Sequence, residues 1–153
     1  MTFEDALGRA YRFLGHRDRT CAEIEKHLSR AGEDAAVTRE VVEELKTQGY
    51  LNDARFAKAF AEDRRKLDGW SSGRIYARLI QLGIAEELAQ DTVSEAGIGD
   101  DVEAAVALLH ARVRMVPTDP RARNRAFGVL ARRGYDADVA YDALRRFERG
   151  ANL

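Results

Sequence analysis

The chain has 153 residues, of which 33% are charged and 45% hydrophobic, and 25 basic against 26 acidic residues leave a formal net charge of −1. The near-neutral total argues against a wholly basic nucleic-acid-binding protein. The longest uninterrupted apolar run, Ala104 to Leu109, has six residues, whereas a membrane helix needs about 20, and no signal peptide follows Met1. With a single cysteine, Cys21, no internal disulfide can form, so we expect a cytoplasmic protein.

An internal repeat of 51 residues organises the chain. The triplet Ile24, Leu28 and Gly32 recurs in the same register as Ile75, Leu79 and Gly83 and again as Ala126, Leu130 and Gly134. We therefore predict an all-α protein of three tandem three-helix units, at 1–50, 51–99 and 100–153, each resembling a helix-turn-helix with one preceding helix. Units that contact mainly their neighbours predict an elongated, curved body.

The first unit carries start and stop signals for its helices. Apolar residues recur at helical spacing from Phe3 to Leu14, which predicts the first helix. Thr20 and Glu23 form a capping-box pattern at the start of the second helix. We expect Gly32 to end that helix in the left-handed conformation, and Gly49 to end the third.

The second and third units repeat this plan. Asp53 is the predicted N-cap of the second unit's first helix, and a turn is expected at 67–73. Two helices should follow, through 75–82 and 88–93. In the third unit a break at 116–120 separates a helix through 102–113 from one capped by Asp119, with Pro120 in its first turn. The last helix runs through Leu144 and Phe147.

The near-neutral total conceals two oppositely charged segments. Residues 84–103 hold seven acids and no Lys or Arg, whereas residues 112–133 hold seven arginines against Asp119 alone, a local net of +6. On a helix, Arg121, Arg125 and Arg132 fall at i, i+4 and i+11 and share one face. Such a stripe suits phosphate or carboxylate contacts, although a merely solvated face is an equally good interpretation.

A smaller basic cluster flanks the only tryptophan. Arg64, Arg65 and Lys66 precede Trp70, and Arg74 and Arg78 lie one turn apart on the following helix. Trp70 is therefore a candidate for stacking on a base of single-stranded nucleic acid. For Tyr50 and Tyr135, each directly after a helix-ending glycine, we expect packing between helices instead.

The sequence offers no pattern typical of an enzyme, a metal site or a bound cofactor. Its histidines make no i, i+4 pair, and its glycines form neither dinucleotide-binding nor phosphate-binding motifs. Cys21 falls in a first helical turn, which can lower a thiol pKa, but a structural thiol is the preferred interpretation. We expect no catalytic residue, no metal and no cofactor.

The junction of the first two units, Gln48 to Ala57 (QGYLNDARFA), resembles the signature of the RecX regulatory proteins, which act on the bacterial RecA recombinase. The resemblance covers roughly residues 5–85. Matching positions on either side of the signature are Tyr11, Leu14, Arg17, Thr20, Glu23, Leu28, Gly32, Arg64, Gly69, Gly73, Ile75, Leu79, Gly83 and Ile84. The third unit departs most, with Ala126 in place of a larger aliphatic residue.

The resemblance implies three three-helix repeats and a non-enzymatic regulator. It implies binding to the RecA filament on DNA and inhibition of filament extension, ATP hydrolysis, strand exchange and coprotease activity, and hence control of recombinational DNA repair and the SOS response. It carries candidate RecA or DNA contacts onto Arg17, Arg64, Arg65, Arg74 and Arg78. Lys66 and Trp70 join them from the basic cluster, and Arg121, Arg125 and Arg132 from the stripe alone.

The expected partners are thus the RecA filament and single-stranded DNA, with double-stranded DNA as a further candidate, and the expected state is a monomer. One alternative is a sequence-specific helix-turn-helix transcriptional regulator. Against it, the expected recognition helix of the middle unit, Glu86 to Glu95, carries four acids and no base. A second alternative is an adaptor that binds only proteins.

Overall fold

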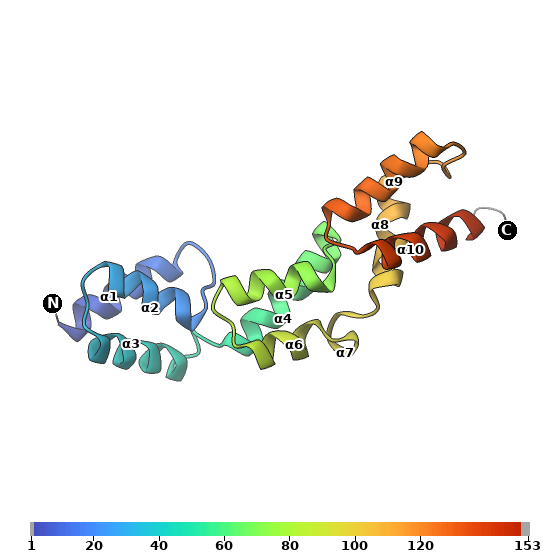
Figure 1. The fold of residues 1–153 in the computed structure, drawn as a ribbon. Coiled ribbons are helices and arrows are strands. Elements are labelled where there is room, and N and C mark those ends of the chain that lie inside the picture. The colour runs from blue at the N-terminus through green and yellow to red at the C-terminus, as the bar shows by residue number, and fades with distance from the viewer. Residues whose placement is uncertain (1, 151–153) are drawn as a thin grey trace. The chain divides into compact units, whose positions relative to one another are not determined.

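The computed structural model describes residues 2–150, and within them all regular secondary structure is helical (Figure 1). The prediction of an all-α fold is confirmed. No helix in this part of the chain is long and apolar enough to cross a membrane.

The first repeat forms three helices in the predicted places: α1 (Phe3–Leu14), α2 (Cys21–Arg30) and α3 (Ala35–Thr47). They pack side by side around Ile24, Leu28 and Leu45, all fully buried. Thr20 and Glu23 form the expected capping box. Gly32 and Gly49 adopt positive φ angles of 89° and 83°, because only glycine takes this conformation without steric cost.

The middle repeat contains α4 (Asp53–Asp63), a π-helical turn η1 (Arg64–Asp68), α5 (Ser72–Gln81), α6 (Glu86–Val93) and the short α7 (Glu95–Ile98). Two local predictions were wrong. The N-cap of α4 is Asn52, whose Oδ1 accepts the Arg55 amide at 3.0 Å, whereas Asp53 accepts the Cys21 amide at the start of α2. The expected turn at 67–73 shortens to 69–71, because the helix continues through η1 and α5 begins at Ser72.

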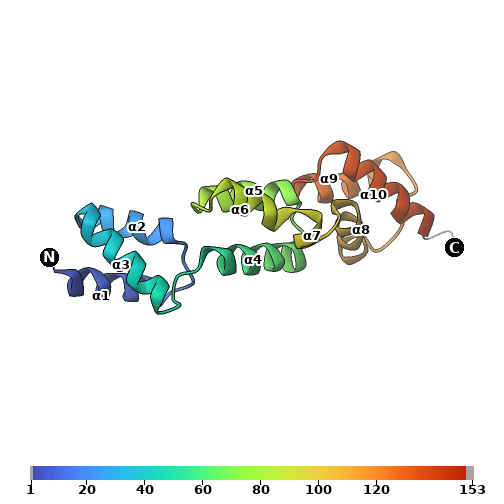
Figure 2. The ribbon, with the colours of Figure 1, turned by 90° about the horizontal axis from the view of Figure 1, so that it is seen from below.

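The third repeat comprises α8 (Asp101–Arg112), α9 (Pro120–Arg132) and α10 (Ala137–Gly150). These helices gather into one group in both views (Figures 1 and 2), around buried Leu109, Leu130 and Leu144. Asp119 caps α9 as predicted, with Pro120 in the first turn. By the 51-residue register of α2 and α5, α9 would begin at residue 123, so it starts three residues early.

Internal contacts divide the chain into two compact units. The first unit holds the residues up to Ala59 together with Leu79–Ala89, and the second holds Phe60–Arg78 together with the residues from Gln90 onward. The middle repeat thus contributes residues to both units.

One joint recurs in both units, formed where the glycine turn of a repeat meets the start of the second helix of the preceding repeat. In the first unit, Thr20 Oγ1 donates to the Leu82 carbonyl at 2.6 Å, beside Gly83. In the second unit, the Ser71 amide donates to the Arg133 carbonyl at 3.0 Å, beside Gly134. The paired positions are 51 residues apart in each case, so the sequence repeat is also a repeat of contacts.

Candidate protein and nucleic-acid interface

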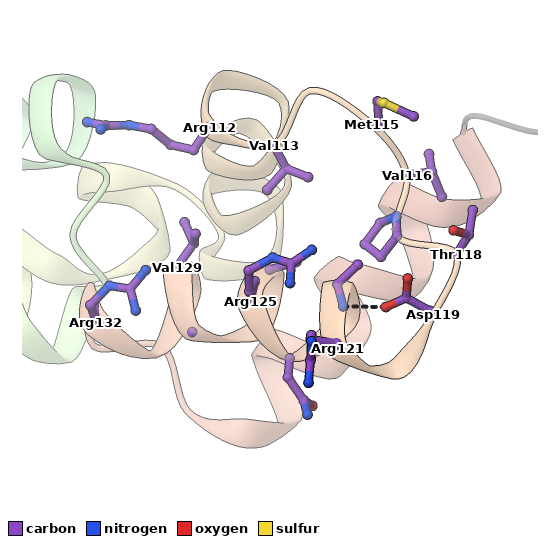
Figure 3. A pocket seen from close by; sticks show the side chains of 15 residues that line it. Arg112, Val113, Met115, Val116, Thr118, Asp119, Arg121, Arg125, Val129 and Arg132 are labelled. Carbon is purple, nitrogen blue, oxygen red and sulfur yellow. Dashed lines mark hydrogen bonds between the residues drawn. The ribbon is translucent and has the colours of Figure 1, made fainter.

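Four arginines line a groove formed by α9 and the segment that connects it to α8, which we name the α9 groove (Figure 3). Arg121, Arg125 and Arg132 lie along α9, as the predicted stripe requires, and all three are exposed. Within residues 2–150 none of them pairs with a carboxylate. Their guanidinium groups therefore remain available to an anionic or hydrogen-bond-accepting partner.

The rest of the groove lining is mainly apolar. Met115, with 78% of its surface exposed, lies in the groove lining with Val116 and Val129. The acid among the lining residues, Asp119, is engaged as the α9 N-cap, where its Oδ1 accepts the Ala122 amide at 2.8 Å. Charged donors beside apolar surface are typical of protein interfaces, where Arg and Met are enriched.

Most residues of this groove were not among the candidates predicted from the sequence, and they include Arg112 at the end of α8 and Met115 on the connecting segment. Arg112 belongs to the arginine-rich segment 112–133, so the charge pattern was a usable signal for it. Met115 carried no such signal, because its exposure depends on the course of the segment between α8 and α9.

Arg65 is an internal residue rather than a surface contact. Its side chain is only 10% exposed and forms an ion pair with Asp101 at 2.8 Å. It also donates to the carbonyl oxygens of Trp70, Ile98 and Gly99 at 2.9, 3.3 and 3.1 Å. These contacts engage the donors of the Arg65 guanidinium within the second unit, so few N–H groups remain for a hydrogen bond to a partner.

Trp70 is half-buried and covered by cations. The Arg74 guanidinium lies 4.3 Å from the ring centroid and that of Arg64 lies 6.0 Å away, distances typical of cation–π contacts. Arg64 is also bound to Asp68 at 2.5 Å, and Arg74 donates to the Arg132 carbonyl at 2.5 Å. These contacts support a packing role for Trp70 and compete with base stacking.

The remaining candidates are Lys66, Arg78 and Arg17. Lys66 and Arg78 are exposed. Arg17 belongs to the first unit, where it pairs with Glu23 and donates to the Asp18 carbonyl at 2.8 Å. The structure therefore brings Arg121, Arg125 and Arg132 together in one groove, and Arg64, Trp70 and Arg74 in another cluster.

The two tyrosines that follow helix-ending glycines behave differently. Tyr135 is 5% exposed, and its hydroxyl donates to the Gly69 carbonyl at 2.7 Å. Its burial raises its pKa to about 12. Tyr50 remains 58% exposed and meets Tyr11 edge to face, with ring centroids 5.9 Å apart. Packing is thus clear for Tyr135, whereas more than half of the Tyr50 surface stays exposed beside its contact with Tyr11.

Two titratable groups of the first unit, Cys21 and His27, have pKa values shifted by burial. Burial, reinforced by the nearby Asp53 carboxylate, raises the pKa of Cys21 to about 11, so the helical first turn does not activate this thiol. Burial and then Arg19 lower the pKa of His27, which stacks on Phe13 with ring centroids 3.9 Å apart. Among residues 2–150 no cluster of three His, Cys, Asp or Glu side chains is placed to hold a metal ion.

Comparison with known proteins defines the class of fold first. The chain aligns with the crystal structure of RecX from Lactobacillus salivarius with a TM-score of 0.74 at 17% identity, covering 96% of this chain and 97% of that one. A second crystal structure of a regulatory protein RecX gives a TM-score of 0.68 at 21% identity over 94% and 73% of the two chains. The chain therefore shares the helical-repeat fold of these two structures.

Sequence comparison then identifies the family. Residues 6–45 match the model of the first three-helix domain of RecX, and residues 52–93 match that of the second. The regulatory protein RecX of Deinococcus radiodurans is 33% identical over 93% of this chain and 68% of its own length, and that of Trichlorobacter lovleyi is 31% identical over 88% and 90%. The chain belongs to the RecX family of regulatory proteins.

Proposed function

We propose that this chain is a non-enzymatic, cytoplasmic regulator that binds the RecA filament on DNA. By binding, it inhibits filament extension, ATP hydrolysis, strand exchange and coprotease activity, and so modulates recombinational repair and the SOS response. Membership of the RecX family carries this proposal, because the family resemblance implies RecA as the target. The free protein is proposed to be a monomer.

The distribution of charge supports a mixed protein and DNA target. Seven arginines in residues 112–133 and seven acids in residues 84–103 give the chain two segments of opposite sign. A uniformly basic protein would favour bare DNA, whereas surfaces of both signs suit a filament that presents protein beside phosphate. Arg121, Arg125 and Arg132 are the proposed contacts with the most available donors, and Lys66 and Arg78 are further exposed candidates.

The RecA-dependent ATPase on single-stranded DNA tests the proposal directly. Wild-type chain in stoichiometric excess should suppress hydrolysis, and the triple variant Arg121→Ala/Arg125→Ala/Arg132→Ala should need about tenfold more protein for the same inhibition. A matched control, Arg146→Ala/Arg149→Ala, removes two exposed arginines from α10 that lie outside the groove. Absence of inhibition by the wild-type chain would refute the proposed function.

A sequence-specific helix-turn-helix regulator remains the alternative of a different class. The structure shows α6, the expected recognition helix of the middle repeat, with Glu86, Glu87 and Asp91 and no base. An acidic helix would be repelled by phosphates at the edges of the major groove. A footprint on one duplex site, absent from unrelated duplexes, would favour this alternative over RecA regulation.

A further inference from the structure

The α9 groove is the repeat equivalent of the joint in the first unit. There, the start and outer face of α2 form a groove whose lining includes Phe13, Ala22, Glu23, Lys26, His27 and Arg30. Adding two periods of 51 residues to these positions gives Met115, Asn124, Arg125, Gly128, Val129 and Arg132. All six of these residues line the α9 groove.

In the first unit, the glycine-closed end of a helix packs against the start of α2 and forms one side of this groove. Gln81, Leu82 and Gly83, at the end of α5, complete the groove, and Thr20 donates to the Leu82 carbonyl. The fit is close, since a Cβ atom on Gly83 would lie 2.2 Å from the Cβ of Ala22. The last carbonyls of a helix lack partners within the helix, so a seat with donors satisfies them.

The joint in the second unit uses the same chemistry. The end of α9 offers its carbonyls to the start of α5, where the Ser71 amide binds the Arg133 oxygen and Arg74 Nη1 binds the Arg132 oxygen at 2.5 Å. Arg74 thus donates a hydrogen bond to a carbonyl at the end of a helix. Its equivalent one period later is Arg125, which lies in the α9 groove.

No helix end of residues 2–150 occupies the equivalent place at α9. The Ala122 amide, which is equivalent to the Ser71 amide, donates to Asp119, so the guanidinium groups of Arg125 and Arg132 are the donors that the groove leaves unused. We infer that the α9 groove docks the glycine-closed C-terminal end of a helix of a protein partner. Resting on the function proposed above, that partner is a RecA protomer of the filament. Arg125 and Arg132 donate to the last carbonyls of the docked helix, whose C-terminus carries a partial negative charge, and Met115 and Val129 cover its apolar side.

Charge matching disfavours a second copy of the chain as the occupant. In the first unit, Arg30 of α2 lines the same groove as the uncharged Gln81, which lies at the end of α5. If the glycine turn at Gly32 of another copy entered the α9 groove, its Arg30 would take the Gln81 position and meet Arg132. Two like charges would then share one seat, which opposes the association.

The apolar lining disfavours single-stranded nucleic acid. The described lining residues include Met115, Val116 and Val129 but no aromatic side chain, whereas strand-binding grooves use aromatic rings as stacking platforms. A helix end, with carbonyls beside apolar side chains, matches both parts of the lining.

Site-directed photo-crosslinking identifies the occupant. A benzophenone amino acid is placed at Asn124, the equivalent of Ala22, and the full chain is irradiated on RecA filaments assembled on single-stranded DNA. Crosslinks should map within about one turn of a glycine that ends a RecA helix. Crosslinks to DNA, to a second copy or to a RecA surface away from a helix end would overturn the inference, as would no crosslink while inhibition persists.

Two groove variants separate this inference from the proposed function. Asn124→Trp fills the seat and Arg125→Ala/Arg132→Ala removes its donors; each should weaken filament inhibition about tenfold, with Arg146→Ala/Arg149→Ala unchanged. Inhibition by both groove variants at the wild-type level would overturn the docking site and leave the proposed function standing.

A peptide titration tests the groove even if the wild-type chain fails to inhibit RecA. A stapled helical peptide with the sequence of residues 72–84 ends in the glycine turn that fills the first joint. Added to the ¹⁵N-labelled full chain, it should shift amide signals of residues 112–132 in the wild type but not in Asn124→Trp. A peptide with its turn glycine replaced by valine should bind about tenfold more weakly. No shift at tenfold excess, or equal binding of the two peptides, would refute the inference.

Discussion

Thr20 and Leu82, 62 residues apart in sequence, are joined by a 2.6 Å hydrogen bond from the threonine hydroxyl to the leucine carbonyl. The same hydroxyl accepts the Glu23 amide at 3.1 Å and caps α2. One fully buried side chain therefore starts its own helix and satisfies the end of another. The N-cap of α2 is thus also a contact that connects two successive repeats.

Replacing Thr20 by valine should destabilise the protein by about 2–3 kcal/mol, since it removes an N-cap and leaves a buried carbonyl without its donor. Chemical denaturation followed by circular dichroism measures the loss. Thr20→Ser keeps the hydroxyl and should lie close to wild type. Thr47→Val removes an exposed hydroxyl that donates to Glu43 within α3 and should change stability by less than about 0.5 kcal/mol. Equal losses for Thr20→Val and Thr47→Val would contradict the linking role.

Gly83→Ala should cost more than Gly49→Ala, although both glycines have nearly the same positive φ, 87° and 83°. The left-handed backbone costs about 1–2 kcal/mol at either position. A Cβ on Gly49 meets open space, whereas one on Gly83 lies 2.2 Å from the Ala22 Cβ, and such overpacking adds about 1–3 kcal/mol.

A double-mutant cycle isolates the steric part of this loss. Ala22→Gly combined with Gly83→Ala should be more stable than the sum of the two single changes predicts, because the glycine removes the colliding Cβ. Thermal unfolding of the four proteins gives the coupling energy. Additive losses would show that the two residues do not collide.

Arg65→Ala should destabilise the second unit by about 3–5 kcal/mol, because it removes the cation partner of the partly buried Asp101 carboxylate, which keeps its hydrogen bonds from Ser72, and removes the donor to three backbone carbonyls. The adjacent exposed residue supplies the control, and Lys66→Ala should stay within about 0.5 kcal/mol of wild type. Arg65→Lys should rescue little, since one ammonium cannot replace a planar fork that reaches Asp101, Trp70 and Gly99 together. Equal stability of the Arg65→Ala and Lys66→Ala proteins in urea would exclude this structural role.

Cys21 should be a slow nucleophile. Its pKa of about 11, against an ordinary 9.0, means that little thiolate forms at pH 9, so iodoacetamide should react at least about tenfold more slowly with the folded chain than with urea-unfolded chain. Mass spectrometry across pH 8–11 measures the rate. Asp53→Asn should accelerate the reaction, because the Asp53 carboxylate disfavours the thiolate, whereas Asp63→Asn should not. A folded-state rate midpoint near pH 9 would contradict the predicted environment.

Local signals in the sequence were sufficient for most of the secondary structure. The apolar spacing from Phe3 to Leu14, the capping box at Thr20 and the glycines at positions 32, 83 and 134 all act within one or two helical turns. Interactions of that range depend only on residues close in sequence, so each helix and its ends could be predicted without knowing which other helices pack against it. The arginine stripe on α9 followed for the same reason.

Predictions that depended on partners distant in sequence were less successful. Aspartate is a common N-cap residue, yet the Asp53 carboxylate accepts the Cys21 amide at the start of α2, and Asn52 is the residue that caps α4. Arg65 and Lys66 are adjacent and similarly charged, yet one is internal and the other exposed. The role of such a side chain depends on which residues distant in sequence lie next to it in the fold. Residue type and local spacing do not identify those neighbours.

The sequence alone determined the all-α class, the 51-residue period and the net charge of each segment, because these depend on residue types and their local spacing. Only the tertiary structure decided which cations are engaged and which are open, since burial and pairing arise when distant segments meet. It also showed that the period governs contacts: two joints are filled by glycine-closed helix ends, and the equivalent seat on α9 remains open among residues 2–150.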